Sequence, residues 1–332
     1  MRKLSIIIPH YATWRWTAIC VNAFKTFGVP VESEIIVCDN SPGNPSIKCL
    51  TETSLGYGVK IVQGDPNLPS HGHGYELCYE QAEGDWIFTA ETDSFPTRSG
   101  WADEYVKASA NYHLIGPPIP QSSGRYIHPA GAAVSRLVLN SALNWMQEHQ
   151  EWIFCPGAAV ALQTSDRPYH VVAHRDFIEE HKDKLSATHY CEIKNWQKAM
   201  QWQQMRCFDE DTFENYSQRT GIKNWNPVPG KLAYNKIGFE AGQWLSYFAQ
   251  DHGFKCLEAP THIEWMPNHH MGQAAFSDVF GGFRHVWCGT SSFSPAIAPD
   301  VREFKMKQMN DAWLTVPEPI RKIIETLEQE HA

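Results

Sequence analysis

The chain has 332 residues, of which 42% are hydrophobic and 20% are charged, so it can bury the core of one elaborated domain or of two closely packed ones. Its formal net charge of −9 argues against a protein that binds nucleic acid through an overall basic surface, although it leaves room for a local basic groove. No apolar stretch reaches the ~18 residues of a membrane span, and residues 1–3 precede an expected strand, so we expect no signal peptide.

The nine cysteines are scattered along the chain and form no C-x-x-C pair. This spacing is typical of reduced thiols rather than of a disulfide framework or a zinc site. Together with the lack of a membrane span, it predicts a cytoplasmic protein.

Three apolar segments of strand length, each ending abruptly in polar residues, stand out in the N-terminal part of the chain. They cover residues 5–11, 34–41 and 85–93. The first two are β-branched and unbroken, which is typical of strands buried on both faces of a parallel sheet. Because ligands bind beyond the carboxyl ends of such strands, we expect the polar tips to meet in one crevice.

Helix signals alternate with these strands. Apolar residues recur at helical spacing over residues 16–27, and Gly28 and Pro30 supply a stop signal. A short third strand is expected over residues 60–63, and a helix over residues 74–83 leads into the strand with the acidic tip. The alternation predicts right-handed crossovers and a Rossmann-like three-layer α/β/α sandwich with a mostly parallel central sheet.

The order of the motifs resembles that of the family 2 glycosyltransferases, whose nucleotide-sugar domain has the GT-A fold. The likeness rests on the Pro-x-Tyr that ends the first strand, on the EIIVCDNS segment at residues 34–41, and on the AEGDWI segment that precedes the acidic triplet at residues 91–93. It is good over residues 3–105 and patchy from about 150 to 290. The residues that the resemblance implies for nucleotide-sugar binding are Pro9, His10, Tyr11, Asp39, Asn40, Asn67 and Thr92.

Within this set, the resemblance places Tyr11 and Asp39 on the base and ribose of the nucleotide. A carboxylate at Asp39 would accept a hydrogen bond from the N3–H group of uracil. The favoured donor is therefore a UDP-sugar.

Glu91 and Asp93 share one strand tip and offer the hard oxygen ligands that Mg²⁺ or Mn²⁺ prefers. A divalent ion there would bridge the phosphates of a sugar nucleotide and neutralise charge on the departing diphosphate. A later segment that contains His269 and His270 resembles the one from which a family histidine returns to the metal or the diphosphate, and either imidazole could serve. The alternatives are solvated acidic groups and histidines in an ordinary loop.

One departure from the family pattern concerns the diphosphate. Gly74, Tyr75 and Glu76 occupy the positions at which the family has Ala-Arg-Asn, so the customary cation is missing. His71 and His73 could replace it as donors at a helix N-terminus, where anions are favoured. The glycines of this segment could equally serve only to permit a tight turn.

The candidate general base is Glu240, at the start of an expected amphipathic helix. The resemblance implies a Glu-Asp pair in this context, and the second residue is Ala241 here. A carboxylate at this place would take the proton of the acceptor hydroxyl during an inverting attack. A helix-start glutamate favoured by the helix dipole is the alternative, and the rival carboxylates are Asp209, Glu210 and Asp211.

The second half of the chain is rich in tryptophan and less regular. We expect a nucleotide-sugar half over residues 1–135, an acceptor half over residues 136–298 with a helical insertion at about 165–236, and C-terminal helices over residues 299–332. Pro317 and Pro319 introduce the last helix, whose apolar side chains could dock it on the body or on another subunit; these are Ile320, Ile323, Ile324 and Leu327.

Taken together, these features predict a metal-dependent glycosyltransferase that moves a sugar from a nucleoside diphosphate sugar to an acceptor hydroxyl, with inversion. The alternatives are a nucleotidyltransferase, and a catalytically silent protein that binds glycans or acts as a scaffold. The acceptor stays open between a glycan, a small molecule and, less favoured, nucleic acid. The sequence leaves the transferred sugar and the oligomeric state undetermined.

Overall fold

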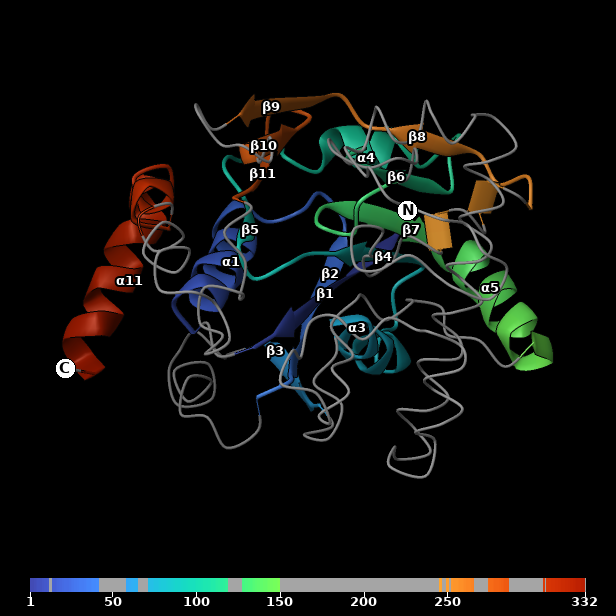
Figure 1. Cartoon of the computed structure of the whole chain (residues 1–332), viewed down its shortest axis with the longest axis horizontal. Helices are drawn as coiled ribbons and strands as arrows, with labels where there is room; N and C mark the ends of the chain where they lie inside the picture. The colour runs from blue at the N-terminus through green and yellow to red at the C-terminus, as the bar shows by residue number, and fades with distance from the viewer. Residues whose placement is uncertain are drawn as a thin grey trace, which may run out of the picture.

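The computed structural model describes residues 1–11, 14–41, 58–64, 71–118, 127–149, 245–246, 249–250, 252–265, 274–286, 307 and 309–331. It has a central sheet with helices on both faces and a second, smaller sheet above it (Figure 1). No helix in the described part of the chain is long and apolar enough to cross a membrane.

The central sheet has seven strands in the order β3-β2-β1-β4-β7-β6-β8. All neighbours pair in parallel except β7, which is antiparallel to both β4 and β6. The strands are β1 (Lys3–His10), β2 (Glu32–Asp39), β3 (Val59–Gln63), β4 (Trp86–Thr89), β6 (Leu114–Gly116), β7 (Ala132–Ser135) and β8 (Cys256–Glu258).

The smaller sheet is antiparallel, with the strand order β5-β11-β10-β9. Its strands are β5 (Ser94–Pro96), β9 (Thr261–Trp265), β10 (Ala274–Val279) and β11 (Phe283–His285). The described helices include α1 (Trp14–Phe27), α3 (His71–Glu80), α4 (Asp103–Ala108), α5 (Arg136–His149) and α11 (Glu318–His331).

Alternation along β1 explains the layers. Ile6 and Ile8 belong to the core cluster that also contains the buried face of α1. Ile7, between them, is buried on the opposite face, where α3 packs against β1 and β2. Because successive side chains of a strand point to opposite faces, an unbroken apolar strand needs a helix on each side. The fold class expected from the sequence, an α/β sandwich with a mostly parallel sheet, is confirmed.

Helix α1 ends where the sequence predicts. Gly28 has a φ of 57°, and its N–H donates to Phe24 O at 2.9 Å, which closes the last turn with a left-handed residue. The indole Nε1–H of Trp101 donates to Gly28 O at 2.7 Å. The end of α1 is therefore tied to the segment that follows β5.

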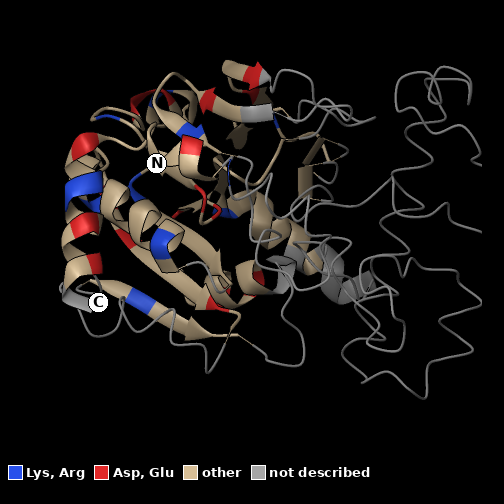
Figure 2. Cartoon of the chain, turned by 60° about the vertical axis from the view of Figure 1, so that its left-hand side comes forward, with Lys and Arg blue, Asp and Glu red and all other residues tan. Residues whose placement is uncertain are grey.

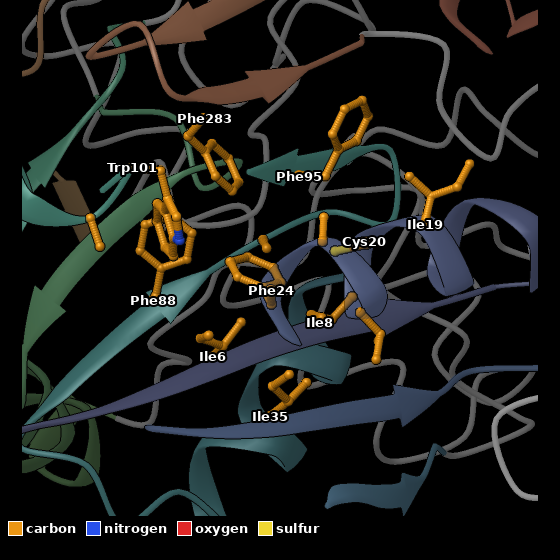
Figure 3. Packing of buried hydrophobic residues seen from close by; sticks show 14 of the residues in the cluster. Ile6, Ile8, Ile19, Cys20, Phe24, Ile35, Phe88, Phe95, Trp101 and Phe283 are labelled. Atoms are coloured by element: carbon orange, nitrogen blue, oxygen red, sulfur yellow. The ribbon is translucent and has the colours of Figure 1, made fainter. Parts of the chain in front are cut away.

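An aromatic cluster joins the two sheets. Phe88 of β4 and Phe283 of β11 lie with ring centroids 5.0 Å apart in an edge-to-face arrangement, and Trp101 lies 5.0 Å from Phe88. Phe24 of α1 completes the contact between the layers (Figure 3). Such pairs contribute beyond the apolar area that they bury. The cluster holds β11 against the tip of the central sheet.

The C-terminal helix docks on the body. Ile320 and Ile324 are fully buried and α11 packs against α1, whereas acidic and basic residues recur along the helix (Figure 2). Arg15 of α1 pairs with Glu328 at 2.9 Å. Of the two locations that the sequence allows for this helix, the structure shows the one on the chain's own body.

Strands from both sides of residue 135 contribute to both sheets. Strand β8 pairs with β6, and β5 pairs with β11. The expected helix at 74–83 is observed as α3, three residues earlier at both ends. The division into halves stays a prediction, and the expected insertion at about 165–236 lies outside the described residues.

We expect Phe283→Ala to lower the free energy of unfolding by about 3–5 kcal/mol, because the substitution opens a cavity between the two sheets. Denaturant unfolding measures this difference. Leu137→Ala, at an exposed position of α5, serves as the control and should stay within about 0.5 kcal/mol of wild type. Similar losses in the two variants would contradict the central place of Phe283.

Candidate functional site

Three strand tips meet at one edge of the central sheet. His10 at the end of β1 lies beside Asp39 at the end of β2. Asn40 N–H donates to His10 O at 2.9 Å, and Ala90 N–H, just after β4, donates to Ile7 O at 3.0 Å. The expected convergence of the polar tips is therefore present in the structure.

A tight turn presents the acidic tip of β4. The Ser94 hydroxyl donates to Glu91 O at 2.8 Å and accepts from Glu91 N–H at 2.9 Å. Ser94 N–H also donates to Glu91 O at 3.0 Å. Thr92 and Asp93 are buried in this turn. The carboxylates of Glu91 and Asp93 are thus held close together on a fixed backbone.

His285 joins the two carboxylates from the other end of the chain. The β5–β11 pairing places it opposite Ser94, and Val286 N–H donates to Asp93 O at 3.0 Å. Its Nε2 lies 3.3 Å from Glu91 Oε2 and 3.4 Å from Asp93 Oδ1. One ligand atom from each of the three residues lies within 4.8 Å of the others.

The hairpin before His285 fixes this position. Phe280 and Gly281 have positive φ values of 51° and 61°, and Gly282 N–H donates to Val279 O at 3.1 Å. Two successive positive φ values with this hydrogen bond form a type I′ turn, and β10 and β11 pair on either side of the three residues 280–282. Sequence analysis missed His285, although the Gly281-Gly282 pair between two apolar segments is a hairpin signal that would have placed a histidine at a strand end.

The charges of the triad balance one another. Burial alone would lower the pKa of His285, but the charges and hydrogen bonds of Asp93 and Glu91 outweigh it and raise that pKa to about 10. A proton on the imidazole thus compensates the buried carboxylate of Asp93 and the half-buried one of Glu91. A divalent cation would provide the same compensation, and two carboxylate oxygens with one imidazole nitrogen form a donor set that suits Mn²⁺ and related ions. The residues present therefore fit a metal.

A second histidine lies beside the triad. His128 is buried, and its ring stacks on that of His285 at a centroid distance of 5.4 Å and an interplanar angle of 21°. Its Nε2 is 4.0 Å from Glu91 Oε1, and its Nδ1 accepts a hydrogen bond from Ala130 N–H at 3.1 Å. His128 is not among the site residues predicted from the sequence.

Residues expected at the nucleotide flank the triad. Asp39 is buried, and its Oδ1 accepts from both the N–H and the hydroxyl of Ser41 at 3.0 Å. Tyr11, at the rim of the tip, is 43% exposed and can present its ring to a ligand. The structure brings both residues to the edge where the sequence expects them.

Asn40 lies between two glycines. A Cβ on Gly64 would come within 2.4 Å of Asn40 Oδ1, and one on Gly74 would come within 2.6 Å of Asn40 Nδ2 and 2.9 Å of Pro9 Cβ. Glycine at these positions lets α3 and the end of β3 approach the tip of β2. Pro9 contributes to this close packing of α3 on β1.

Tyr75 occupies the position at which the glycosyltransferases that the sequence resembles have a cation. It is fully buried, and its hydroxyl donates to Ala90 O at 3.2 Å. Burial also raises its pKa well above the ordinary value of a tyrosine, so it stays neutral. Tyr75 therefore supports the end of β4 from the α3 side.

The remaining predicted site residues lie partly or wholly outside the described part of the chain. Helix α3 begins at His71 and includes His73, but the side chains of both are outside the description. The residues that lie wholly outside the described part of the chain are Asn67, Asp209, Glu210, Asp211, Glu240, His269 and His270.

No protein-family model matches the sequence, and no curated protein matches it. Solved structures match in part. TarS 1–349 from S. aureus is 14% identical with a TM-score of 0.36, and the match covers 46% of this chain and 50% of that one. TarS 1–349 in complex with UDP-GlcNAc is 13% identical with a TM-score of 0.39, over 66% and 79% of the two chains.

A third match is the mannosyltransferase PcManGT from Pyrobaculum calidifontis, in complex with GDP-Man and Mn²⁺. It is 16% identical with a TM-score of 0.37, and the match covers 42% of this chain and 47% of that one. This chain thus spans about half the length of PcManGT and of the first TarS structure. These partial likenesses carry no conclusion about what this chain binds.

The structure also predicts an acid-sensitive contact at His10. This residue is buried, with Nδ1 2.7 Å from the Thr17 hydroxyl of α1, and burial lowers its pKa to about 4 although the charge of Asp39 acts in the opposite direction. Between its ordinary pKa of about 6.5 and pH 4, the unfolded chain binds a proton that the folded chain does not. Stability that is fully present above pH 6.5 is therefore lost as the pH falls towards 4.

We expect His10→Gln to have a shallower dependence of unfolding free energy on pH over this window than wild type. Denaturant unfolding at a series of pH values measures it. His252→Gln, at an exposed histidine, is the control and should keep the steepness of wild type. An unchanged slope in His10→Gln would show that other groups cause the acid sensitivity.

Proposed function

We propose that this chain transfers a sugar from a nucleoside diphosphate sugar to an acceptor hydroxyl, with a divalent metal held by Glu91, Asp93 and His285. The observation that carries the proposal is the Glu91, Asp93 and His285 triad at the carboxyl edge of the parallel strands, where His285 Nε2 lies 3.3 and 3.4 Å from the two carboxylates. Ligands of open α/β sheets bind at this edge. The resemblance of the strand-tip motifs to family 2 glycosyltransferases supplies the reaction class.

In this proposal the triad binds the diphosphate of the sugar nucleotide through the metal, and Tyr11 and Asp39 bind its base. When bound, Mg²⁺ or Mn²⁺ would neutralise charge that develops on the departing diphosphate. Glu91 and Asp93 would hold the ion on the rigid turn that Ser94 closes. Tyr11 would flank the base, and Asp39, oriented by Ser41, would accept a hydrogen bond from it. A uracil N3–H suits that carboxylate, so UDP is the nucleotide that we propose.

In the transfer step, the acceptor oxygen forms a bond to the anomeric carbon while the bond from that carbon to the diphosphate oxygen breaks. The acceptor proton passes to a general base, for which Glu240 is proposed, with Asp209, Glu210 and Asp211 as rivals. Attack from the face opposite the diphosphate gives inversion. These carboxylates lie outside the described residues, so the base and the stereochemistry rest on the resemblance.

The two other functions stay open to test. A nucleotidyltransferase would release pyrophosphate from a nucleoside triphosphate, whereas the proposed enzyme releases a nucleoside diphosphate from a sugar nucleotide. A silent binding protein would release neither. Incubation with Mn²⁺ and a panel of UDP- and GDP-sugars, followed by detection of the released nucleotide, separates the three functions.

We expect Asp93→Asn to weaken Mn²⁺ binding by about 100-fold or more, because a neutral amide oxygen is a much weaker ligand for a hard cation than a carboxylate, and loss of a ligand's hydrogen-bonded partner alone can cost up to that factor. UDP binding should then lose its dependence on Mn²⁺. Calorimetry with and without a chelator measures both effects. The control is Glu104→Gln, at an exposed glutamate of α4, which should bind like wild type. Wild-type affinity in Asp93→Asn would rule out the proposed metal site.

We expect Glu240→Gln to keep donor binding but to lower turnover by about 10²- to 10⁴-fold, because an amide cannot accept the acceptor's proton. A rate assay with the correct acceptor measures this loss. NMR of the product's anomeric proton reads the stereochemistry. Near-normal turnover in Glu240→Gln would move the role to one of the rival carboxylates.

A further inference from the structure

The two carboxylate oxygens of Glu91 face different histidines. Oε2 lies 3.3 Å from Nε2 of His285, on the side that it shares with Asp93. Oε1 lies 4.0 Å from Nε2 of His128. A glutamate has three rotatable side-chain bonds, so something must fix which of its oxygens enters a metal site. His128 is placed to do so.

The imidazole of His128 is itself fixed in orientation. Its Nδ1 accepts from Ala130 N–H at 3.1 Å, which assigns the hydrogen of the neutral ring to Nε2, the atom that faces Glu91. The ring is buried and stacked on His285. In such a setting the attraction between an N–H dipole and a carboxylate is stronger than in water.

The backbone around His128 is tied to the sheet as well. His128 N–H donates to Pro117 O at 2.8 Å. The Thr89 hydroxyl at the end of β4 donates to Pro129 O at 2.5 Å, and Gly131 N–H donates to Thr89 O at 2.9 Å. The segment that carries the histidine is therefore anchored to the strand that carries Glu91.

We propose that His128 is a positioning residue whose Nε2–H, 4.0 Å from Glu91 Oε1, attracts that oxygen electrostatically, so that Glu91 would bind the divalent metal through Oε2 alone. This inference rests on the metal site of the proposed function. Partners of this kind orient a ligand and change metal affinity without touching the ion. Each residue of the triad would then supply one oxygen or nitrogen ligand, and the remaining coordination positions of the ion would be open to the diphosphate.

A pair of matched substitutions tests the role. His128→Gln keeps an N–H donor at about the place of Nε2, whereas His128→Asn keeps an acceptor for Ala130 N–H but loses the donor to Glu91. We expect His128→Asn to weaken Mn²⁺ binding by about 10- to 100-fold and His128→Gln to stay within a few-fold of wild type. Counting free Mn²⁺ by electron paramagnetic resonance measures the affinities.

If His128 served only to support the local structure, His128→Asn would bind Mn²⁺ more tightly than His128→Gln. Only asparagine keeps an acceptor for Ala130 N–H, whose hydrogen bond closes the turn. Wild-type affinity in His128→Asn, or an equal loss in both variants, would overturn the proposal. If wild-type protein itself binds no Mn²⁺, the proposed metal site fails as well; if wild type binds and His128→Asn binds equally, the positioning role alone fails.

A measurement on wild-type protein covers the case in which a variant does not fold. Electron spin-echo modulation of the Mn²⁺ complex detects directly coordinated imidazole nitrogens. The proposal predicts one coupled ¹⁴N, from His285. A second coupled nitrogen that persists in His269→Ala and in His270→Ala would make His128 a ligand rather than a positioning residue and would overturn the proposal.

Discussion

The candidate site depends on the short antiparallel pairing of β5 with β11. This pairing sets His285 opposite Ser94 and so brings an imidazole from late in the chain to the carboxylates of Glu91 and Asp93. Phe283, two residues earlier, anchors β11 in the aromatic cluster between the sheets. Core packing and ligand geometry are therefore linked through a three-residue strand, because a one-residue slip would turn His285 to the other face.

The triad places the Asp93 carboxylate and the His285 imidazole in the interior and the Glu91 carboxylate at its edge, where unpaired charges are costly. The carboxylates raise the pKa of His285 to about 10, so a proton can balance them. The same arrangement suits a divalent ion, which would replace that proton. Tyr75 supports the end of β4 instead of supplying a cation, so in the proposed function charge on a diphosphate would be met by the metal and the start of α3.

The local parts of this arrangement could be predicted from the sequence, and the non-local parts could not. Unbroken apolar segments predicted β1 and β2, Gly28 predicted the end of α1, and the acidic triplet predicted one side of the site. His285 was missed because its place depends on strand pairing across the chain, and the search for a late histidine went to His269 and His270. His10 was expected at the nucleotide, but α1 covers it and Thr17 pairs with it, so that role stays a prediction.

The most direct test of the central claim is a crystal structure of the full chain grown with Mn²⁺ and UDP, with diffraction data collected to reveal the anomalous signal of manganese. The account predicts one strong peak between the Asp93 carboxylate, Glu91 Oε2 and His285 Nε2, with the diphosphate on its open side. A manganese peak at another place, or an ordered UDP with no manganese among these three side chains, would contradict it.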